Sequence, residues 1–381
     1  MNPLTQGGTQ TIVPMAAAPS DPRAVAAKAA AFASIDEALG HEVDFLRALV
    51  GHSSTRGQTN GVQHLVAGTL REMGLRVDEV TVERERIARL PGFSPADWPY
   101  DGLFQVVGTL PAAGSGGTAG TGGRSLLLNG HVDVVSAEPV AHWTHNPWAG
   151  EVAGGRMYGR GTGDMKAGIA AMIYALQAVQ VAGIGLRGDV LVETVFDEEC
   201  GGNGTLALLA QGYRADAAVA HPLNYNVGVI QGGDWPSSVP EACTLEVRFA
   251  CYPGEDLDVV QARFHHGVLR VTAADDWLRE HPPELAFFGF RGEGAVYDLE
   301  SDVVRTVAAN HAQVLGTPLR VGVSTASDDR RFFQLYHGIP AVCYGPIGGQ
   351  IHAVDEWVDL ESLRVCTRVL AGVLIDWCGV A

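Results

Sequence analysis

The chain has 381 residues, 46% of them hydrophobic, which is enough to bury a large core in one big domain or in two or three smaller ones. Its formal charge of −17, from 43 acidic and 26 basic residues, would repel a phosphate backbone, so we expect no nucleic-acid partner. No run of residues approaches the roughly 18 apolar residues that a membrane span needs, so we expect no membrane partner either.

Residues 1 to about 20 are small, polar and interrupted by proline, and they predict a disordered leader without a signal peptide. The six cysteines include no Cys-x-x-Cys pair, which is typical of a reducing compartment, so we expect a cytoplasmic protein.

The first helix is expected to begin at Pro22, with Asp21 as its N-cap. The segments "HEVDFLRALVGHS" and "GVQHLVAGTLREMGLRVDEVTVE" then predict helix, helix and strand, with Gly74 closing the second of these helices.

A glycine-rich segment, "PAAGSGGTAGTGGR" at residues 111–124, is expected to form a flexible hairpin tip between two apolar runs. Beyond it, strands of the buried type alternate with segments of helical period. The expected strands are "SLLLNG", "DVLVETVF", "DAAVA" and "PAVCYG". This alternation predicts an α/β core.

The pattern changes between about residues 222 and 318, where strands lie close together around one helical segment. It predicts a small α+β unit inserted into the α/β core. We therefore expect a core made of residues 21–221 and 319–381, with residues 222–318 as an inserted domain.

Metal-binding or acidic side chains stand where several of the expected core strands end. In an open α/β sheet the carboxyl ends of the strands line the ligand crevice, so these side chains can converge. Asp164 joins them from "YGRGTGDMK", where two glycines allow the backbone to approach closely. The complete set is His131, Asp133, Asp164, Glu198, Glu199, Asp328 and His352.

Two histidines with several carboxylates match the ligands of zinc or cobalt, and a shared carboxylate allows two ions about 3.5–4 Å apart. We expect Asp164 to bridge the two ions and His131 to bind one of them. Glu199 and His352 are expected to bind the other. Asp133 lies two residues beyond His131, on the same side of an extended chain, so it is expected to hold the second imidazole nitrogen.

Glu198 is the predicted general base. In an extended chain it points away from Glu199, so it can face a substrate while its neighbour binds metal. It would take a proton from the attacking water and return it to a leaving nitrogen, which is worth roughly 10²–10⁴ in rate. The arrangement predicts amide hydrolysis.

Five other histidines have no such support and are expected to be surface or packing residues: His142, His145, His265, His266 and His281.

Four segments carry a family resemblance: "LLLNGHVDVV", "YGRGTGDMKAGIAAM", "ETVFDEECGGNGT" and "GGQIHAVDEWV". They resemble the signature blocks of the co-catalytic zinc peptidases that include acetylornithine deacetylase, succinyl-diaminopimelate desuccinylase, aminoacylase and glutamate carboxypeptidase. The resemblance runs from about residue 40 to the C-terminus. It implies a mixed central sheet with helices on both faces and a lid domain through which homodimers form. It also implies two metal ions and the metal-binding and base roles given above, which belong to His131, Asp164, Glu198, Glu199 and His352. It also implies that Arg330 binds a substrate carboxylate, although an ion pair with Asp328 or Asp329 is equally open.

The chain departs from this family at His221. The family places an acidic residue before proline at the end of the next core strand, where it completes the metal site of His131. Here "DAAVA" is followed by His221 and Pro222. Either His221 is itself a ligand, since neutral imidazole suits zinc, or an internal deletion has removed the acidic ligand, a lid histidine and half of the lid.

Three functions follow from these residues and this resemblance. The leading one is a two-metal amidohydrolase that removes an acyl group from an N-acyl amino acid. The second is a dipeptidase or carboxypeptidase of the same chemistry. The third, suggested by the missing lid segment, is a metal-binding relative with impaired catalysis that acts as a binding protein.

Overall fold

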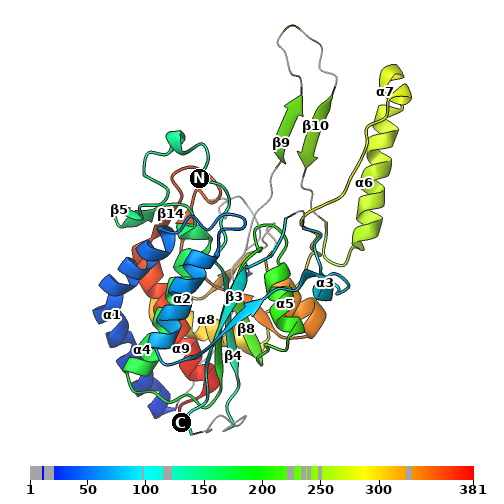
Figure 1. The fold of residues 1–381 in the computed structure, drawn as a ribbon. Helices are drawn as coiled ribbons and strands as arrows, with labels where there is room; N and C mark the ends of the chain where they lie inside the picture. The colour runs from blue at the N-terminus through cyan, green and yellow to red at the C-terminus, as the bar shows by residue number, and fades with distance from the viewer. Residues whose placement is uncertain are drawn as a thin grey trace.

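The computed structural model describes residues 11–12, 21–96, 98–114, 122–220, 227–232, 237, 242–247, 251–322 and 328–381. Helices cover a central sheet to form the main body of the protein. A hairpin and a helical segment project from this body (Figure 1). Within the described residues, no helix is both long and apolar enough to cross a membrane.

The central sheet has six strands. In chain order they are β2 (Arg76–Thr81), β3 (Phe104–Leu110), β4 (Leu126–His131), β7 (Val190–Val195), β8 (Ala217–Ala220) and β12 (Ala341–Cys343). In space the order is β12-β8-β4-β7-β3-β2; the neighbours from β12 to β7 run parallel, and β3 and β2 add antiparallel pairs. The sheet is therefore mixed, as predicted.

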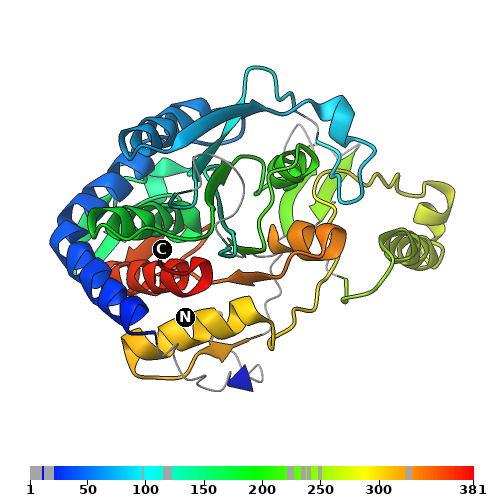
Figure 2. The same cartoon turned by 90° about the horizontal axis from the view of Figure 1, so that it is seen from below.

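Helices cover both faces of this sheet. The larger set is α1 (Pro22–Val50), α2 (Asn60–Glu72), α4 (Ala167–Val181), α8 (Asp302–Leu315) and α9 (Leu360–Cys378). The opposite face carries α3 (Arg84–Ile87), α5 (Asn203–Ala210) and the irregular turn η4 (Phe332–Tyr336). Because successive residues of a strand point to opposite faces, Leu126 and Leu128 pack in the core of the larger set, and Leu127 packs in the other core. Figure 2 shows α4, α9 and α8 as neighbours in one layer. The predicted α/β class is confirmed.

The predicted helix ends agree with the structure. Helix α1 begins at Pro22, and Oδ1 of Asp21 accepts the amide proton of Arg23 at 2.9 Å. It continues without a break to Val50. Gly74 follows α2 with a φ of +80°, a conformation that favours glycine.

The glycine-rich segment at residues 111–124 does not connect a hairpin. The strands on either side of it, β3 and β4, are not neighbours, because β7 lies between them and pairs with both. The expectation of a hairpin was wrong because apolar runs indicate where strands lie but do not identify the strands they pair with. Residues 115–121 lie outside the described part of the chain.

A second sheet lies beside the candidate site. Its four antiparallel strands are β5 (Glu151–Ala153), β6 (Arg156–Tyr158), β13 (Gly348–Gly349) and β14 (Trp357–Asp359), in the order β13-β14-β6-β5. Pairing of β6 with β14 brings Tyr158 opposite Trp357. Two chain segments about 200 residues apart therefore meet here.

The range predicted as an inserted domain, residues 222–318, contains β9 (Val227–Gly232), β10 (Cys243–Val247), α6 (Leu257–Thr272) and α7 (Asp276–Glu280). Strands β9 and β10 form an antiparallel pair that projects from the core beside α6 and α7 (Figure 1). Helix α8 falls inside the same range but packs in the larger core through Val303, Val304 and Val307. The projecting part therefore ends before α8.

Three further short elements lie in the described part of the chain. They are β1 (Thr11–Ile12), which pairs antiparallel with β11 (Arg320–Val321), and the turn η2 (Val140–His142). Strand β1 falls in the predicted leader, the rest of which lies outside the described residues.

Candidate metal centre

The sheet brings the ends of two parallel strands to one edge. His131 is the last residue of β4 and pairs in register with Val195, the last residue of β7. Asp133 follows the first strand, and Glu198 and Glu199 follow the second. Side chains more than 60 residues apart in sequence therefore meet, as the strand-end argument predicts.

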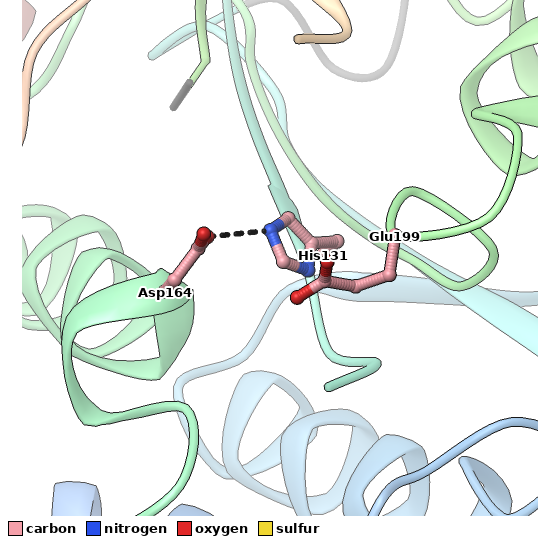
Figure 3. A group of neighbouring side chains, drawn as sticks. All are labelled: His131, Asp164 and Glu199. Atoms are coloured by element: carbon pink, nitrogen blue, oxygen red, sulfur yellow. Dashed lines mark hydrogen bonds and ion pairs between the residues drawn. The ribbon is translucent and has the colours of Figure 1, made fainter. Parts of the chain in front are cut away.

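Three of the predicted ligands form a tight cluster. His131, Asp164 and Glu199 each place one ligand atom within 4.8 Å of the others (Figure 3). Figure 3 shows them arriving from β4, from the distorted turn η3 (Thr162–Lys166) and from the loop after β7. His352 completes the cluster from the segment between β13 and β14, with its Nε2 3.1 Å from Oε2 of Glu199.

Asp164 lies between the two histidines. Its Oδ1 is 3.0 Å from Nε2 of His131, and its Oδ2 is 3.7 Å from Nε2 of His352. Each carboxylate oxygen thus faces a different imidazole. This is the arrangement that the predicted bridging role requires, and the donor set of imidazole and carboxylate suits zinc or cobalt.

Asp133 supports the cluster in a different way from the one expected. Nδ1 of His131 is 3.0 Å from the main-chain oxygen of Asp133 and 3.6 Å from its carboxylate. The carboxylate instead accepts the amide protons of Glu198 at 3.4 Å and Glu199 at 3.1 Å. Asp133 therefore orients the imidazole through its backbone and the two glutamates through its side chain.

Two buried oxygens indicate that a cation fits here. Among the described residues, none donates a hydrogen bond to Oδ2 of Asp164 or to Oε2 of Glu198. The latter oxygen lies 3.6 Å from Nε2 of His131. Since a buried carboxylate oxygen without a partner is costly, a divalent ion coordinated by this set would stabilise it.

Burial and charge act against each other in the cluster. Burial lowers the pKa of His131, but the carboxylates of Glu198 and Asp164 outweigh it and hold that pKa well above its ordinary value. Burial raises the pKa of Glu198, and His131 offsets this only in part. For His352, burial again lowers the pKa, while Glu199 and Asp164 raise it. A cation that binds here would take the place of protons on these groups.

Arg330 is engaged by a neighbour. Its Nε and Nη2 bond Oδ1 and Oδ2 of Asp328 at 2.7 and 2.6 Å, and its guanidinium stacks on Tyr297 at 4.2 Å. Both carboxylate oxygens of Asp328 therefore bind Arg330, and Asp328 is not among the residues of the metal cluster. Binding of a substrate carboxylate by Arg330 stays a prediction.

The other histidines that the sequence predictions concern fall into three groups. His221 lies outside the described residues, so its role as a ligand stays a prediction. His145 stacks on Tyr158 at 4.1 Å, and His281 stacks on Trp277 at 4.5 Å. His142, His265 and His266 are exposed.

Three buried acids beside the cluster were not predicted from sequence as residues of the metal centre. Asp197 accepts a hydrogen bond from the hydroxyl of Tyr100 at 2.6 Å, and Asp329 accepts one from Thr205 at 2.5 Å. Burial raises the pKa of each of these aspartates to about 7. The third, Glu356, is fully buried behind the loop of Asp164. The only signal was their proximity to predicted ligands in "FDEE", "SDDRR" and "HAVDEW".

A cavity of about 340 Å³ adjoins the ligands. Its lining includes Asp133 and Glu199, together with Arg56, Trp98 and Cys200. Nη2 of Arg56 lies 3.5 Å from Sγ of Cys200. The volume is in the lower part of the range for small-molecule pockets, about 300–1,000 Å³.

Known proteins are similar to this chain in sequence or in fold. The model of "Peptidase family M20/M25/M40" matches residues 127–376. The N-formyl-4-amino-5-aminomethyl-2-methylpyrimidine deformylase of Bacillus subtilis is 27% identical over 408 residues, which cover 84% of this chain and 90% of that protein. The succinyl-diaminopimelate desuccinylase of Rhodospirillum centenum is 34% identical over 381 residues, which cover 79% and 97%.

Solved structures show the same fold at lower identity. Human carnosine dipeptidase 1 matches with a TM-score of 0.68 and 13% identity, over 92% of this chain and 99% of that one. The Bacillus subtilis YXEP protein, described as a dinuclear metal binding peptidase, matches with a TM-score of 0.53 and 14% identity, over 89% and 98%.

Proposed function

Because the chain belongs to peptidase family M20/M25/M40, we propose that it removes the acyl group from an N-acyl amino acid or a related small amide. The chain is a hydrolase that acts on amide bonds, like the deformylase and the desuccinylase to which it is similar. The observation that carries the proposal is the position of Asp164 between His131 and His352, with Glu198 beside them.

Two divalent ions, zinc or cobalt, complete the proposed site. His131 would hold one ion and Glu199 with His352 the other, with Asp164 shared between them. When bound, such ions lower the pKa of a water to near 7 and polarise the scissile carbonyl. The dinuclear neighbour of the same fold supports two ions rather than one.

Glu198 moves the proton in this proposal. Its Oε2 is buried and accepts no hydrogen bond from the described residues, so it is available to the attacking water. Burial raises its pKa, which suits a group that must hold a proton and then release it to the leaving nitrogen. Asp133 keeps the backbone of Glu198 in place.

A small N-acyl substrate is supported by two observations. The deformylase and the desuccinylase are both named for the removal of an acyl group. The adjoining cavity is also small, and its wall offers an aromatic ring at Trp98 and a guanidinium at Arg56. A dipeptidase is the second candidate, because the same centre would cleave a peptide bond.

A substrate panel separates these candidates. We expect N-formyl, N-acetyl or N-succinyl amino acids to be hydrolysed faster than dipeptides in the presence of zinc or cobalt. Faster cleavage of dipeptides would favour the second candidate. No turnover on any of them, with metal still tightly bound, would leave only a binding protein that retains the fold.

The role of Glu198 has its own test. Replacement of Glu198 by Gln should lower kcat by roughly 10²–10⁴-fold with metal content unchanged, because the proton acceptor is lost and the ligands are not. Replacement of the exposed Glu72 by Gln is the matched control and should leave kcat unaltered. A Glu198→Gln enzyme within tenfold of the wild-type rate would refute the assignment.

We further propose a cytoplasmic homodimer that associates through the projecting part of the chain, which comprises β9, β10, α6 and α7. Helix α6 exposes Val259 and Val271, which supports a surface that a second copy covers. The six cysteines are free, which agrees with a reducing compartment. Light scattering that gives the mass of one chain at micromolar concentration would contradict the dimer.

A further inference from the structure

A fully buried carboxylate that the proposed reaction does not use lies against the loop of Asp164. Glu356 is 0% exposed. Its Oε1 accepts the amide protons of Gly163 at 2.8 Å and Asp164 at 3.0 Å. Its Oε2 accepts the amide proton of Gly161 at 3.0 Å and a proton from Nη1 of Arg160 at 2.6 Å. One side chain therefore receives four donors from one short stretch of chain.

The loop is shaped to wrap around this carboxylate. Gly161 has a φ of +81°, where glycine is favoured. At Gly163, a Cβ atom would lie 3.4 Å from Oε1 of Glu356 and 3.3 Å from the main-chain oxygen of Trp357, which is tight. The main-chain oxygen of Glu356 also accepts the amide proton of Gly159 at 2.9 Å. The loop is thus bonded to both the side chain and the backbone of Glu356.

Glu356 also belongs to the segment that carries a metal-binding histidine. It lies four residues beyond His352 and directly before β14, whose pairing with β6 fixes this segment. We propose that Glu356 is a positioning residue that sets Asp164 and His352 relative to one another, and so fixes the spacing of the two metal sites. The inference rests on the proposed function, because it takes both residues as metal ligands.

Only a carboxylate can accept all four bonds. Glutamine offers one oxygen, and its amide group is a donor. In one orientation its amide would face Gly161 and Arg160, and in the other it would face Gly163 and Asp164. Glu356→Gln is therefore nearly isosteric yet leaves two buried donors without an acceptor, and the loop must shift to satisfy them.

A second buried carboxylate provides the control for lost stability. Asp376, on α9, forms a buried ion pair with Lys28 at 2.5 Å and accepts a hydrogen bond from Asn310 at 2.8 Å. Asp376→Asn removes the same charge from a core site that has no bond to the metal ligands. Both variants should melt at a lower temperature than the wild-type protein when no metal is present.

The test is metal binding by the full-length chain. Metal-free proteins are titrated with Zn²⁺ in a calorimeter, and the visible absorption spectrum of the Co²⁺-loaded proteins reports the coordination geometry. We expect Glu356→Gln to lose about ten- to a hundredfold in affinity for at least one ion and to change the cobalt spectrum. Asp376→Asn should keep the wild-type affinity and spectrum.

Gly163→Ala reaches the same contact from the loop side without changing a charge. It should cause a smaller loss of affinity in the same direction, and it replaces Glu356→Gln if that variant does not fold. Unchanged affinity and spectrum in the folded variant would overturn the positioning role. If the wild-type chain itself bound no divalent ion, the proposed function would be refuted, and this inference with it.

Discussion

Asp164 directs its two carboxylate oxygens toward different imidazoles, Oδ1 toward His131 and Oδ2 toward His352. The residue types and their approximate places could be predicted from sequence, because each predicted ligand in the cluster stands near the end of a strand or at a glycine-rich turn. The sequence could not predict which carboxylate oxygen faces which imidazole nitrogen, because residue spacing does not determine side-chain rotamers. Asp133 shows the limit: it holds the imidazole with its backbone oxygen rather than its carboxylate.

Replacement of Asp164 by Asn tests the bridge at the scale of one residue. An amide nitrogen would face either His131 or His352, so one of the two oxygen contacts is lost. We expect the number of tightly bound ions to fall from two per chain to one or none, measured by metal analysis after dialysis. Replacement of the exposed Asp276 by Asn should leave the count unchanged. Two ions with unaltered affinity in Asp164→Asn would contradict a bridging carboxylate.

At the scale of elements, α1 and α9 are joined across the larger core by a polar contact. Oε1 of Glu42 on α1 accepts a hydrogen bond from Oγ1 of Thr367 on α9 at 2.5 Å. Burial raises the pKa of Glu42 to about 7, and the bond from Thr367 offsets this only in part. Apolar periodicity predicted such helices, but their packing partners depend on the whole sheet.

Glu42 gives the folded protein a pH dependence. Its pKa is raised on folding, so between about pH 4.5 and 7 the folded state keeps a proton that the unfolded chain releases. Stability is therefore full at low pH and falls as pH rises through this window, by on the order of 3 kcal/mol at about 1.4 kcal/mol per pKa unit. Glu42→Gln should melt higher relative to wild type at pH 8 than at pH 5. The exposed Glu37→Gln is the control, and an equal difference at both pH values would refute the effect.

At the scale of the whole molecule, the candidate site ties together distant parts of the chain. His131 ends one strand of the central sheet and Glu199 follows the neighbouring strand, while Asp164 and His352 come from segments joined by the second sheet. Strands β9 and β10 and helices α6 and α7 project away from the central sheet (Figure 1). Metal binding should therefore stabilise the core as a unit.

Removal of metal should lower the melting temperature by several degrees. An ion present at 100 to 1,000 times its Kd adds about 2.7–4.1 kcal/mol to the free energy of unfolding. Scanning calorimetry with and without a chelator measures this difference. Asp164→Asn should show a smaller shift, because it binds fewer ions. If the melting temperature of the wild-type protein were identical with and without chelator, no metal ion would be linking the predicted ligands.

The sequence by itself determined the α/β class, the ends of its first helices and which residue types stand at the edge of the sheet as predicted ligands. Local periodicity, capping and strand ends depend on neighbouring residues, so a sequence shows them directly. Only the tertiary structure decided that β7 lies between β3 and β4, that α8 belongs to the core, and that Glu356 holds the loop of Asp164. These facts depend on strand pairing and burial, which bring together residues that sequence keeps far apart. His221 and Arg330 stay predictions that mutation and metal analysis can test.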